Sequence, residues 1–226
     1  MNDLYIPESL DRYRAPWPQR ADRWHDHLPF IYDLTASAQP RLVVDLTLGD
    51  GEQACFAICQ AMKDFRVDGL LYAFGKPADA QANNRHNRDH YAGFSYQMDA
   101  LPEQPEQRFA PGSIELLHID CAAETDAADT LARWQPLLAP GALVLLHGIN
   151  SYQTLWQDCQ RSGASFLFPA GEGLGVLRLG TDATALAAGH TPLLALLLTD
   201  HDHNEQLQAL YQHVVQHLSL KGDGGI

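Results

Sequence analysis

The chain has 226 residues, of which 46% are hydrophobic and 19% are charged, and this balance fits one globular domain with a sizeable core. Its formal net charge is -13 and it contains no basic run, which argues against a nucleic-acid partner because phosphates are bound by clustered Lys and Arg. The polar, proline-interrupted start is not a secretory signal, and the longest apolar run, Leu193 to Leu198, is far shorter than the ~20 residues that span a bilayer. We therefore expect a cytoplasmic protein without a membrane span.

The four cysteines also favour the cytoplasm, where thiols stay reduced. They are Cys55, Cys59, Cys121 and Cys159, and they form no CxxC pair. Cys55 and Cys59 are one helical turn apart, a spacing more typical of a buried helix face than of a metal site.

The N-terminal part of the chain is predicted to form an extended arm and then the first helices and strands. Residues 1–20 are rich in Pro and Arg, which favours the arm. A helix is predicted from Ala21 to Ser37, because apolar residues recur there at helical spacing. Pro29 lies inside this span and either kinks the helix or marks its true start. The next segments are predicted as a strand (Arg41 to Leu46), a helix (Gly51 to Lys63), a strand (Gly69 to Phe74), an exposed loop (Lys76 to His90) and a strand (Phe94 to Met98).

The remaining elements continue this alternation. They are strands at Ile114 to Ile119 and Ala142 to His147, helices at Glu124 to Trp134 and Tyr152 to Arg161, two final strands at 165–169 and 175–180, and an amphipathic helix at 204–218. Alternating strands and helices predict an α/β domain over residues 21–220, with a Rossmann-like, mostly parallel sheet of seven strands and helices on both faces. The closely spaced final strands suggest an antiparallel hairpin. In such a sheet the ligand crevice lies beyond the carboxyl ends of the strands, near the switch point after the first strand.

One glycine-containing motif lies where the first strand passes into a helix, and it reads Asp45-Leu46-Thr47-Leu48-Gly49-Asp50-Gly51. Glycines in this position let backbone amides approach a ligand, and the following helix presents unpaired N–H groups. The acid at the strand end can accept hydrogen bonds from an ammonium or hydroxyl group. Such turns also occur in α/β proteins without this kind of ligand, so the motif alone leaves both interpretations open.

The segments around the motif resemble those of class I S-adenosylmethionine-dependent methyltransferases, in particular those found in bacterial glycan gene neighbourhoods or fused to glycosyltransferases. The similar blocks are Trp24-x-x-His27-x-Pro29-Phe30, Phe56 to Ala61, His90 to Ser95, Gly112 to Asp120, Trp134-x-Pro136-x-Leu138-x-Pro140-Gly141 and Gly171-x-Gly173-Leu174-Gly175-Val176. The resemblance runs from about Trp24 to Gly180. It implies the class I methyltransferase fold, S-adenosylmethionine as the methyl donor, and a hydroxyl of a sugar, glycan or small molecule as the acceptor.

The resemblance also implies a donor site. Its positions in this chain are Asp45, Thr47, Gly49, Gly51, Gly75 and Asp99. Thr47 stands at the first glycine of the family motif, whereas the two later glycines match it. Asp99 follows the third strand, where it either accepts from the adenine amino group or caps the turn before Pro102.

Besides Thr47, three positions depart from the family pattern. Gly75 stands where the family has the acid that binds the ribose hydroxyls, which removes charge-assisted hydrogen bonds of ~1.5–3 kcal/mol each. Asp79 in the next segment is an alternative carboxylate. Ala123 and Gly148 stand where the family has a His and an Asp. Because the core-forming blocks remain, these changes predict a retained fold with a weakened donor site.

The candidate catalytic residues are Asp120 and His147, which end neighbouring strands and face the crevice. His147 is a candidate base for the acceptor hydroxyl, and Asp120 is a candidate to orient the substrate or the base. Alternatively, both side chains form hydrogen bonds with the backbones of the nearby loops. Without the family's two other polar residues, these two alone give a thin shell for a metal ion, so we expect no metal site. His118 lies two residues deeper on its strand and is expected to be a core histidine.

Several further residues have both a structural and a functional interpretation. Trp24 and His27 line the donor pocket or pack in the core, with packing favoured for Trp24. Arg85 and Arg88 bind an acidic group or belong to a solvated loop. His201-Asp202-His203 has the spacing of metal ligands but lies in a polar connector, and we assign it no metal.

Two functions remain open from the sequence. The first is a methyltransferase that acts on a glycan or small-molecule hydroxyl. The second is a non-catalytic relative of the fold, a binding or assembly module in a glycan pathway that has lost donor-binding residues. The C-terminal helix packs on its own sheet or on a second subunit, so a homodimer or a glycan-pathway partner is possible. An NAD-dependent oxidoreductase has little support, because the turn lacks GxGxxG and the second strand ends without an acid.

Overall fold

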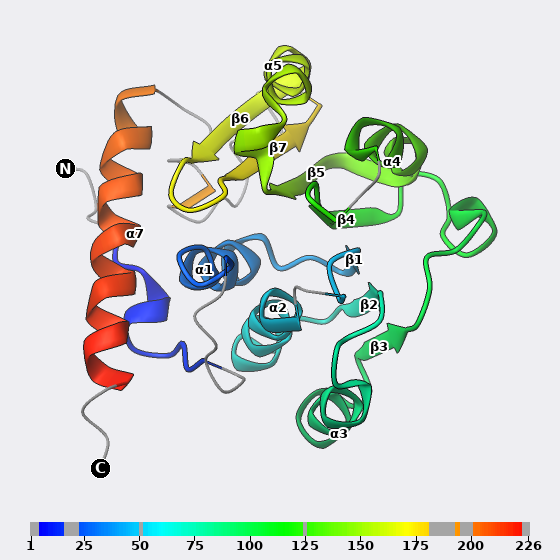
Figure 1. The fold of residues 1–226 in the computed structure, drawn as a ribbon, viewed down its shortest axis with the longest axis horizontal. Helices are drawn as coiled ribbons and strands as arrows, with labels where there is room; N and C mark the ends of the chain where they lie inside the picture. The colour runs from blue at the N-terminus through cyan, green and yellow to red at the C-terminus, as the bar shows by residue number, and fades with distance from the viewer. Residues whose placement is uncertain are drawn as a thin grey trace.

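A computed structural model of the chain describes residues 5–15, 23–49, 52–123, 126–180, 193–194 and 201–222, with side chains of the last helix described for 204–219. Its centre is a seven-stranded sheet with the order β3-β2-β1-β4-β5-β7-β6 (Figure 1). The strands are β1 (Leu42–Asp45), β2 (Leu70–Phe74), β3 (Ser95–Met98), β4 (Ile114–Asp120), β5 (Leu138–His147), β6 (Gly163–Phe168) and β7 (Leu174–Leu179). The predicted α/β fold with a seven-stranded sheet is therefore confirmed.

Helices cover both faces of this sheet, as expected. They are α1 (Leu28–Ala38), α2 (Glu52–Asp64), α3 (Ala80–Tyr91), α4 (Ala127–Trp134), α5 (Gln153–Ser162) and α7 (His201–Gly222), with short 3-10 turns η1 (Glu8–Leu10), η2 (Pro105–Gln107), η3 (Gln135–Leu137) and η4 (Ile149–Ser151). One hydrophobic core joins the sheet to α1, α2 and α7, and a second joins its other face to α4 and α5. Cys55 and Cys59 are fully buried free thiols on α2, as their spacing predicts.

The strand directions bring the candidate site residues to one edge. Strands β1 to β5 run parallel, whereas β7 is antiparallel to both β5 and β6, which confirms the predicted hairpin. Because β1 lies between β2 and β4, the topological switch point is at its carboxyl end, at Asp45. Asp120 and His147 are direct register partners at the ends of β4 and β5.

Two predicted elements differ in the structure. Helix α1 begins at Leu28 with Pro29 in its first turn, so residues 23–27 form turns rather than helix; proline fits the first turn because its missing N–H is not needed there. The predicted loop at 76–90 is wrong, because it contains helix α3. The Asp79 carboxylate accepts the amide of Ala82 at 2.9 Å and caps this helix.

A buried carboxylate ties the N-terminal segment to the C-terminal helix. Asp33 of α1 accepts from the backbone N and the Oγ of Ser9, at 2.8 and 2.6 Å, and from the hydroxyl of Tyr211 on α7, at 2.8 Å. The hydroxyls of Tyr211 and Tyr5 lie 2.9 Å apart. The C-terminal helix therefore packs on its own domain. In the described part of the chain, none of the helices has the length and apolarity that a membrane crossing needs.

Candidate functional site

The carboxyl end of β1 holds a buried acid. Asp45 is fully buried, and its Oδ1 accepts from the backbone N and the Oγ1 of Thr47, at 2.8 and 2.7 Å. Its other oxygen, Oδ2, is buried without a hydrogen bond in normal range. Burial raises the pKa of Asp45 to about 6, although the bonds from Thr47 and the nearby Cys55 thiol lower it. Thr47, at the predicted first-glycine position, thus holds Oδ1 of the acid, and Oδ2 is left buried with no hydrogen bond in normal range.

The turn after β1 packs against the turn after β2. Gly75 has a φ of +143°, and its N–H donates to the Met98 carbonyl at 2.9 Å. A Cβ at Gly75 would lie 2.6 Å from the backbone N of Gly49, closer than real atoms approach. Gly75 therefore permits the two turns to approach closely. A side chain with a carboxylate at this position would require the backbone at Gly49 to shift.

The structure describes the remaining predicted donor positions only in part. Asp99 follows β3 and is exposed. Gly51, with Asp50, lies outside the described residues. Asp79, the alternative carboxylate, is engaged as the cap of α3. Among the residues described here, β1 thus ends in a buried acid, Asp45, whereas β2 ends at Phe74 without an acidic residue.

The neighbouring part of the edge is built around Asp120 and His147, both fully buried. The Nδ1 of His147 lies 3.8 Å from the Oδ1 of Asp120. The Nε2 of His147 lies 3.2 Å from the carbonyl oxygen of Arg23, and because a carbonyl only accepts, Nε2 donates there. In this conformation Nε2 carries a proton, and the lone pair of the neutral ring is on the buried Nδ1, on the Asp120 side.

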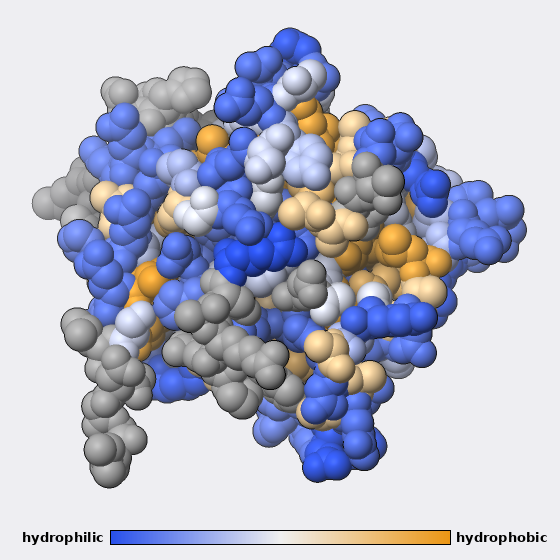
Figure 2. All heavy atoms as spheres, viewed as in Figure 1, coloured by the Kyte–Doolittle hydropathy of each residue, from blue (hydrophilic) through white to orange (hydrophobic). Residues whose placement is uncertain are grey.

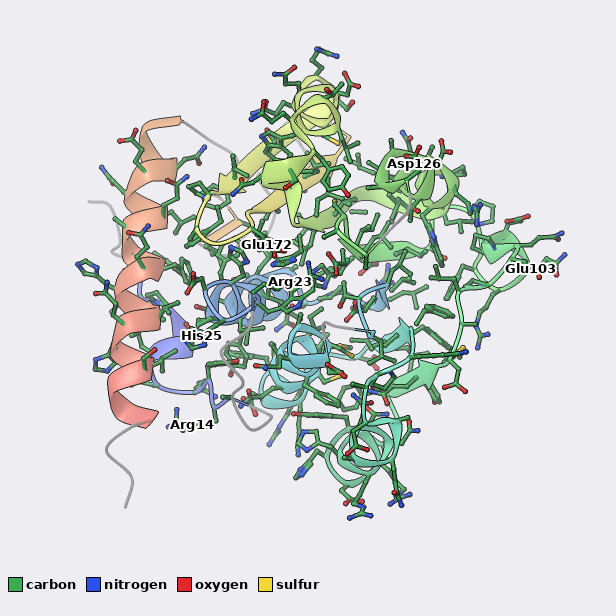
Figure 3. The ribbon with its side chains drawn as sticks, in the orientation of Figure 1. Arg14, Arg23, His25, Glu103, Asp126 and Glu172 are labelled. Atoms are coloured by element: carbon green, nitrogen blue, oxygen red, sulfur yellow. The ribbon has the colours of Figure 1, made fainter. Side chains whose placement is uncertain are left out.

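Two residues that precede α1 cover this pair. The guanidinium of Arg23 is paired with Asp120 and, at 2.8 Å, with Glu172 from the loop between β6 and β7. Figure 3 shows Arg23 and Glu172 next to each other near α1, and Figure 2 shows a hydrophilic surface in the same central region. The indole of Trp24 stacks on His147 with ring centroids 3.6 Å apart and is itself fully buried. Arg23 and Trp24 together form what we call the cover.

Burial and the contact with Arg23 set the pKa values of the ionisable groups in this region. Burial raises the pKa of Asp120, but His147 and Arg23 outweigh this effect and hold it below the ordinary value. Burial lowers the pKa values of His27 and His118 to about 3, so both rings are neutral at physiological pH. His27 contacts the Ala170 carbonyl through Nε2 at 3.0 Å, and His118 lies edge-on to Trp24 in the core. Trp24 and His118 are buried in the core, as expected, although neither ring nitrogen of His118 has a hydrogen bond among the described residues and its Nδ1 lies 3.6 Å from the Oδ1 of Asp45.

Two of the positions that depart from the family pattern, Ala123 and Gly148, lie beside this pair, and the Ala123 N–H donates to the Asp120 carbonyl at 3.2 Å. A Cβ on Gly148 would be 3.8 Å from the Oδ1 of Asp120 and 3.4 Å from the Ala122 Cβ. A carboxylate at Gly148 would thus stand next to Asp120. Among the described residues, no group of three or more His, Cys, Asp and Glu is arranged to hold a metal ion. Arg85 and Arg88 are exposed on α3, and the His201 to His203 side chains lie outside the described set.

The sequence did not indicate the part played by Arg23 and Glu172. They are 149 positions apart and belong to a turn and a loop, where no periodic pattern exists to relate them. Glu172 lies inside the block Gly171-x-Gly173, whose two glycines both have positive φ. The two glycines indicate a tight loop at this place, but they do not indicate its partner.

No protein-family model and no curated protein matches the sequence. Solved structures do match. A methyltransferase from Geobacter sulfurreducens has a TM-score of 0.53 at 20% identity, over 73% of this chain and 81% of that one. The O-methyltransferase TomG of Streptomyces achromogenes, solved with S-adenosylmethionine (SAM), has a TM-score of 0.53 at 13% identity, over 72% and 82%. The methyltransferase PaMTH1 of Podospora anserina, bound to S-adenosylhomocysteine (SAH), has a TM-score of 0.51 at 12% identity, over 77% and 88%. At these identities the likeness shows the fold, and the chain has the Rossmann-like fold of class I methyltransferases.

Proposed function

We propose that the chain is a SAM-dependent methyltransferase-like protein with a weakened donor site, acting on a hydroxyl of a sugar, glycan or small molecule. The observation that carries this proposal is the buried carboxylate of Asp45 at the switch point of the sheet, whose Oδ2 has no hydrogen bond in normal range and lies near the weak donor of the Cys55 thiol. A buried carboxylate oxygen without a partner is unfavourable, and it suits the ammonium group of a methionine moiety. TomG and PaMTH1, which share the fold, were solved with SAM and SAH, and this supports the same ligand class here.

The donor site is expected to bind weakly because its second carboxylate is missing. Gly75 supplies no acceptor for ribose hydroxyls, and each charge-assisted bond lost costs about 1.5–3 kcal/mol. The contact between the turns at Gly49 and Gly75 leaves no room for a side chain there. Asp45, Thr47, Gly49 and Gly51 then hold the methionine end of the donor without help from β2.

When bound, SAM supplies an electrophilic methyl group, and the chain's own residues position the acceptor and manage its proton. In the present conformation the proton of His147 is on Nε2, bonded to the Arg23 carbonyl. If the cover moves away, a proton on Nδ1 faces Asp120 and is stabilised by it, which frees Nε2 to take the acceptor's proton. Asp120 is thus the positioning residue and His147 the base.

The cover determines when this chemistry is possible. Arg23 neutralises Asp120 and Trp24 occupies the face of His147, so an acceptor must displace both residues to reach the pair. Asp120 and Glu172 would then be free to accept hydrogen bonds from neighbouring hydroxyls, which suits a polyhydroxylated acceptor such as a sugar.

A second candidate function is a non-catalytic binding or assembly module in a glycan pathway. The close contact between Gly75 and Gly49 favours it, because this contact closes the ribose position with backbone atoms. The closed cover over Asp120 and His147 favours it as well.

Ultraviolet crosslinking of the full chain with methyl-labelled SAM separates the two functions. The first predicts covalent labelling that SAH competes away and that Asp45→Asn reduces, whereas the exposed Asp68→Asn leaves it unchanged. Absence of label in a folded chain would favour the non-catalytic module.

A further inference from the structure

A cavity lies at the amino-terminal ends of the parallel strands, whereas the site described above lies at their carboxyl ends. It has a volume of about 790 Å³ and is lined by the end of α1, by the amino-terminal ends of β4 and β5, and by Arg178 of β7. Because parallel strands place their amino ends together, this edge is separate from the carboxyl ends that carry Asp45 and His147. Its size is within the range of small-molecule pockets.

The cavity contains a cation without a counter-charge. Of its lining residues that the structure describes, two are arginines and one, Glu115, is an acid. Glu115 is fully engaged by Arg41, which donates to it from its backbone N at 2.7 Å and from Nε at 2.9 Å. Arg178 is in no ion pair within the described part of the chain, so one positive charge is left over in a protein whose net charge is -13.

The guanidinium of Arg178 lies next to the backbone of Gly141 and has an unsatisfied donor. Its Nη1 is shielded from solvent and meets no hydrogen-bond acceptor among the described residues. A Cβ on Gly141, which has a φ of +80°, would lie 3.5 Å from Nη2 and 3.6 Å from Nε, so the planar group lies over this glycine. A buried donor without an acceptor is unfavourable unless a ligand supplies one.

We propose that this cavity binds a small molecule through a phosphate or carboxylate group held by Arg178. The guanidinium fork matches two oxygens of such a group, and a charge-assisted pair of this kind is the strong form of hydrogen bond. Ser37, Ser113 and the Pro140–Gly141 backbone line the rest of the cavity and provide polar contacts for the remainder of the ligand. The site does not depend on the proposed methyl transfer.

Amide NMR titration of the full chain with inorganic phosphate, at constant ionic strength against chloride, tests the proposal. We expect saturable shifts at Ser113, Gly141 and Arg178, with sodium acetate as a second titrant that tells phosphate from carboxylate preference. Arg178→Gln should weaken binding about tenfold, the loss expected for one charge-assisted pair. Arg161→Gln on α5 makes the same charge change at an exposed position away from the cavity and should leave binding unchanged.

Arg178→Lys keeps the charge without the fork and serves if the Gln variant does not fold. It should bind phosphate more weakly than the wild type and more tightly than Arg178→Gln. Shifts that do not saturate with either anion would overturn the proposal, as would saturable shifts that persist unchanged in both Arg178 variants.

Discussion

The indole of Trp24 lies parallel to the imidazole of His147, with ring centroids 3.6 Å apart and an interplanar angle of 18°. A residue that precedes the first helix thus packs on the end of the fifth strand, at the edge where ligands bind in this class of sheet. Because Trp24 is fully buried, the stack is a packed core contact, and an acceptor that displaces the cover must supply the free energy of that contact.

Replacing Trp24 should therefore be costly. Trp24→Ala removes a fully buried aromatic side chain and should lower the free energy of unfolding by about 3–5 kcal/mol. Trp24→Phe keeps a stacking ring and should lose clearly less. Urea denaturation measures both. A loss in Trp24→Ala as small as that of a surface substitution would contradict the burial of the cover.

Arg23→Gln should loosen the cover through Asp120. Asp120 now has a pKa below its ordinary value, so it contributes stability above the unfolded pKa of about 3.9, and this contribution is lost as the pH falls through the folded value. Without Arg23 the pKa of Asp120 should rise, and stability near neutral pH should fall by about 1–2 kcal/mol. Carboxyl NMR titration follows the pKa. An unchanged Asp120 pKa in the variant would show that Arg23 does not hold this acid.

Gly75→Asp restores the acid that the family pattern has, yet it should not restore donor binding. Its Cβ would meet the Gly49 backbone N at 2.6 Å, and its backbone would keep a φ of +143°, so the variant should be destabilised. Gly93→Ala separates the cost of a positive φ from the cost of the steric clash. Gly93 has a φ of +100°, but nothing lies within 4 Å of its added Cβ. Thermal denaturation should place Gly75→Asp well below Gly93→Ala. Equal losses would mean that the contact with Gly49 is unimportant.

Asp45 should make stability depend on pH. Its folded pKa of about 6 lies above the unfolded value of about 3.9, so the protonated acid favours folding and its contribution is lost as the pH rises through about 6. The wild type should therefore lose about 2 kcal/mol of stability relative to Asp45→Asn as the pH rises from 4 to 7. Other groups, including Asp33 with a pKa also near 6, cancel in the difference. Urea denaturation of both proteins across this range tests it, and parallel stability curves would refute the raised pKa.

Tyr211→Phe should loosen the C-terminal helix. The variant removes the hydroxyl that donates to Asp33 at 2.8 Å and leaves a buried carboxylate with one bond fewer, at a cost of about 1–3 kcal/mol. Hydrogen exchange should rise in α7 more than in the central strands. Tyr152→Phe removes a hydroxyl outside this network and serves as the control. Equal protection of α7 in the variant and the wild type would show that Asp33 does not anchor this helix.

Much of the fold could be predicted because buried strands and amphipathic helices leave periodic patterns. Helix α3 was missed since it is rich in Asn and His rather than apolar residues. Its Asn83 and Asn87 side chains are nevertheless buried, and Asn87 donates to the Ser95 carbonyl at 3.2 Å, so a polar face does the packing. The start of α1 was misplaced because Trp24 continues its apolar spacing while lying in a turn.

The candidate site could be predicted only in part. The gathering of Asp45, Asp120 and His147 follows from parallel strands, whose carboxyl ends share one edge. The pairing of Arg23 with Glu172 depends on how two irregular segments meet in space, which local sequence does not encode. Gly75 reads in the sequence as a missing acid, and the close approach to Gly49 became visible only in three dimensions.

Calorimetric titration of the full chain with SAH tests the central claim most directly, since it needs no acceptor and no opening of the cover. The proposal predicts a weak, single-site heat signal that disappears in Asp45→Asn and persists in Asp68→Asn. The absence of any heat at millimolar SAH from a folded chain would contradict the retained donor site and leave the non-catalytic function.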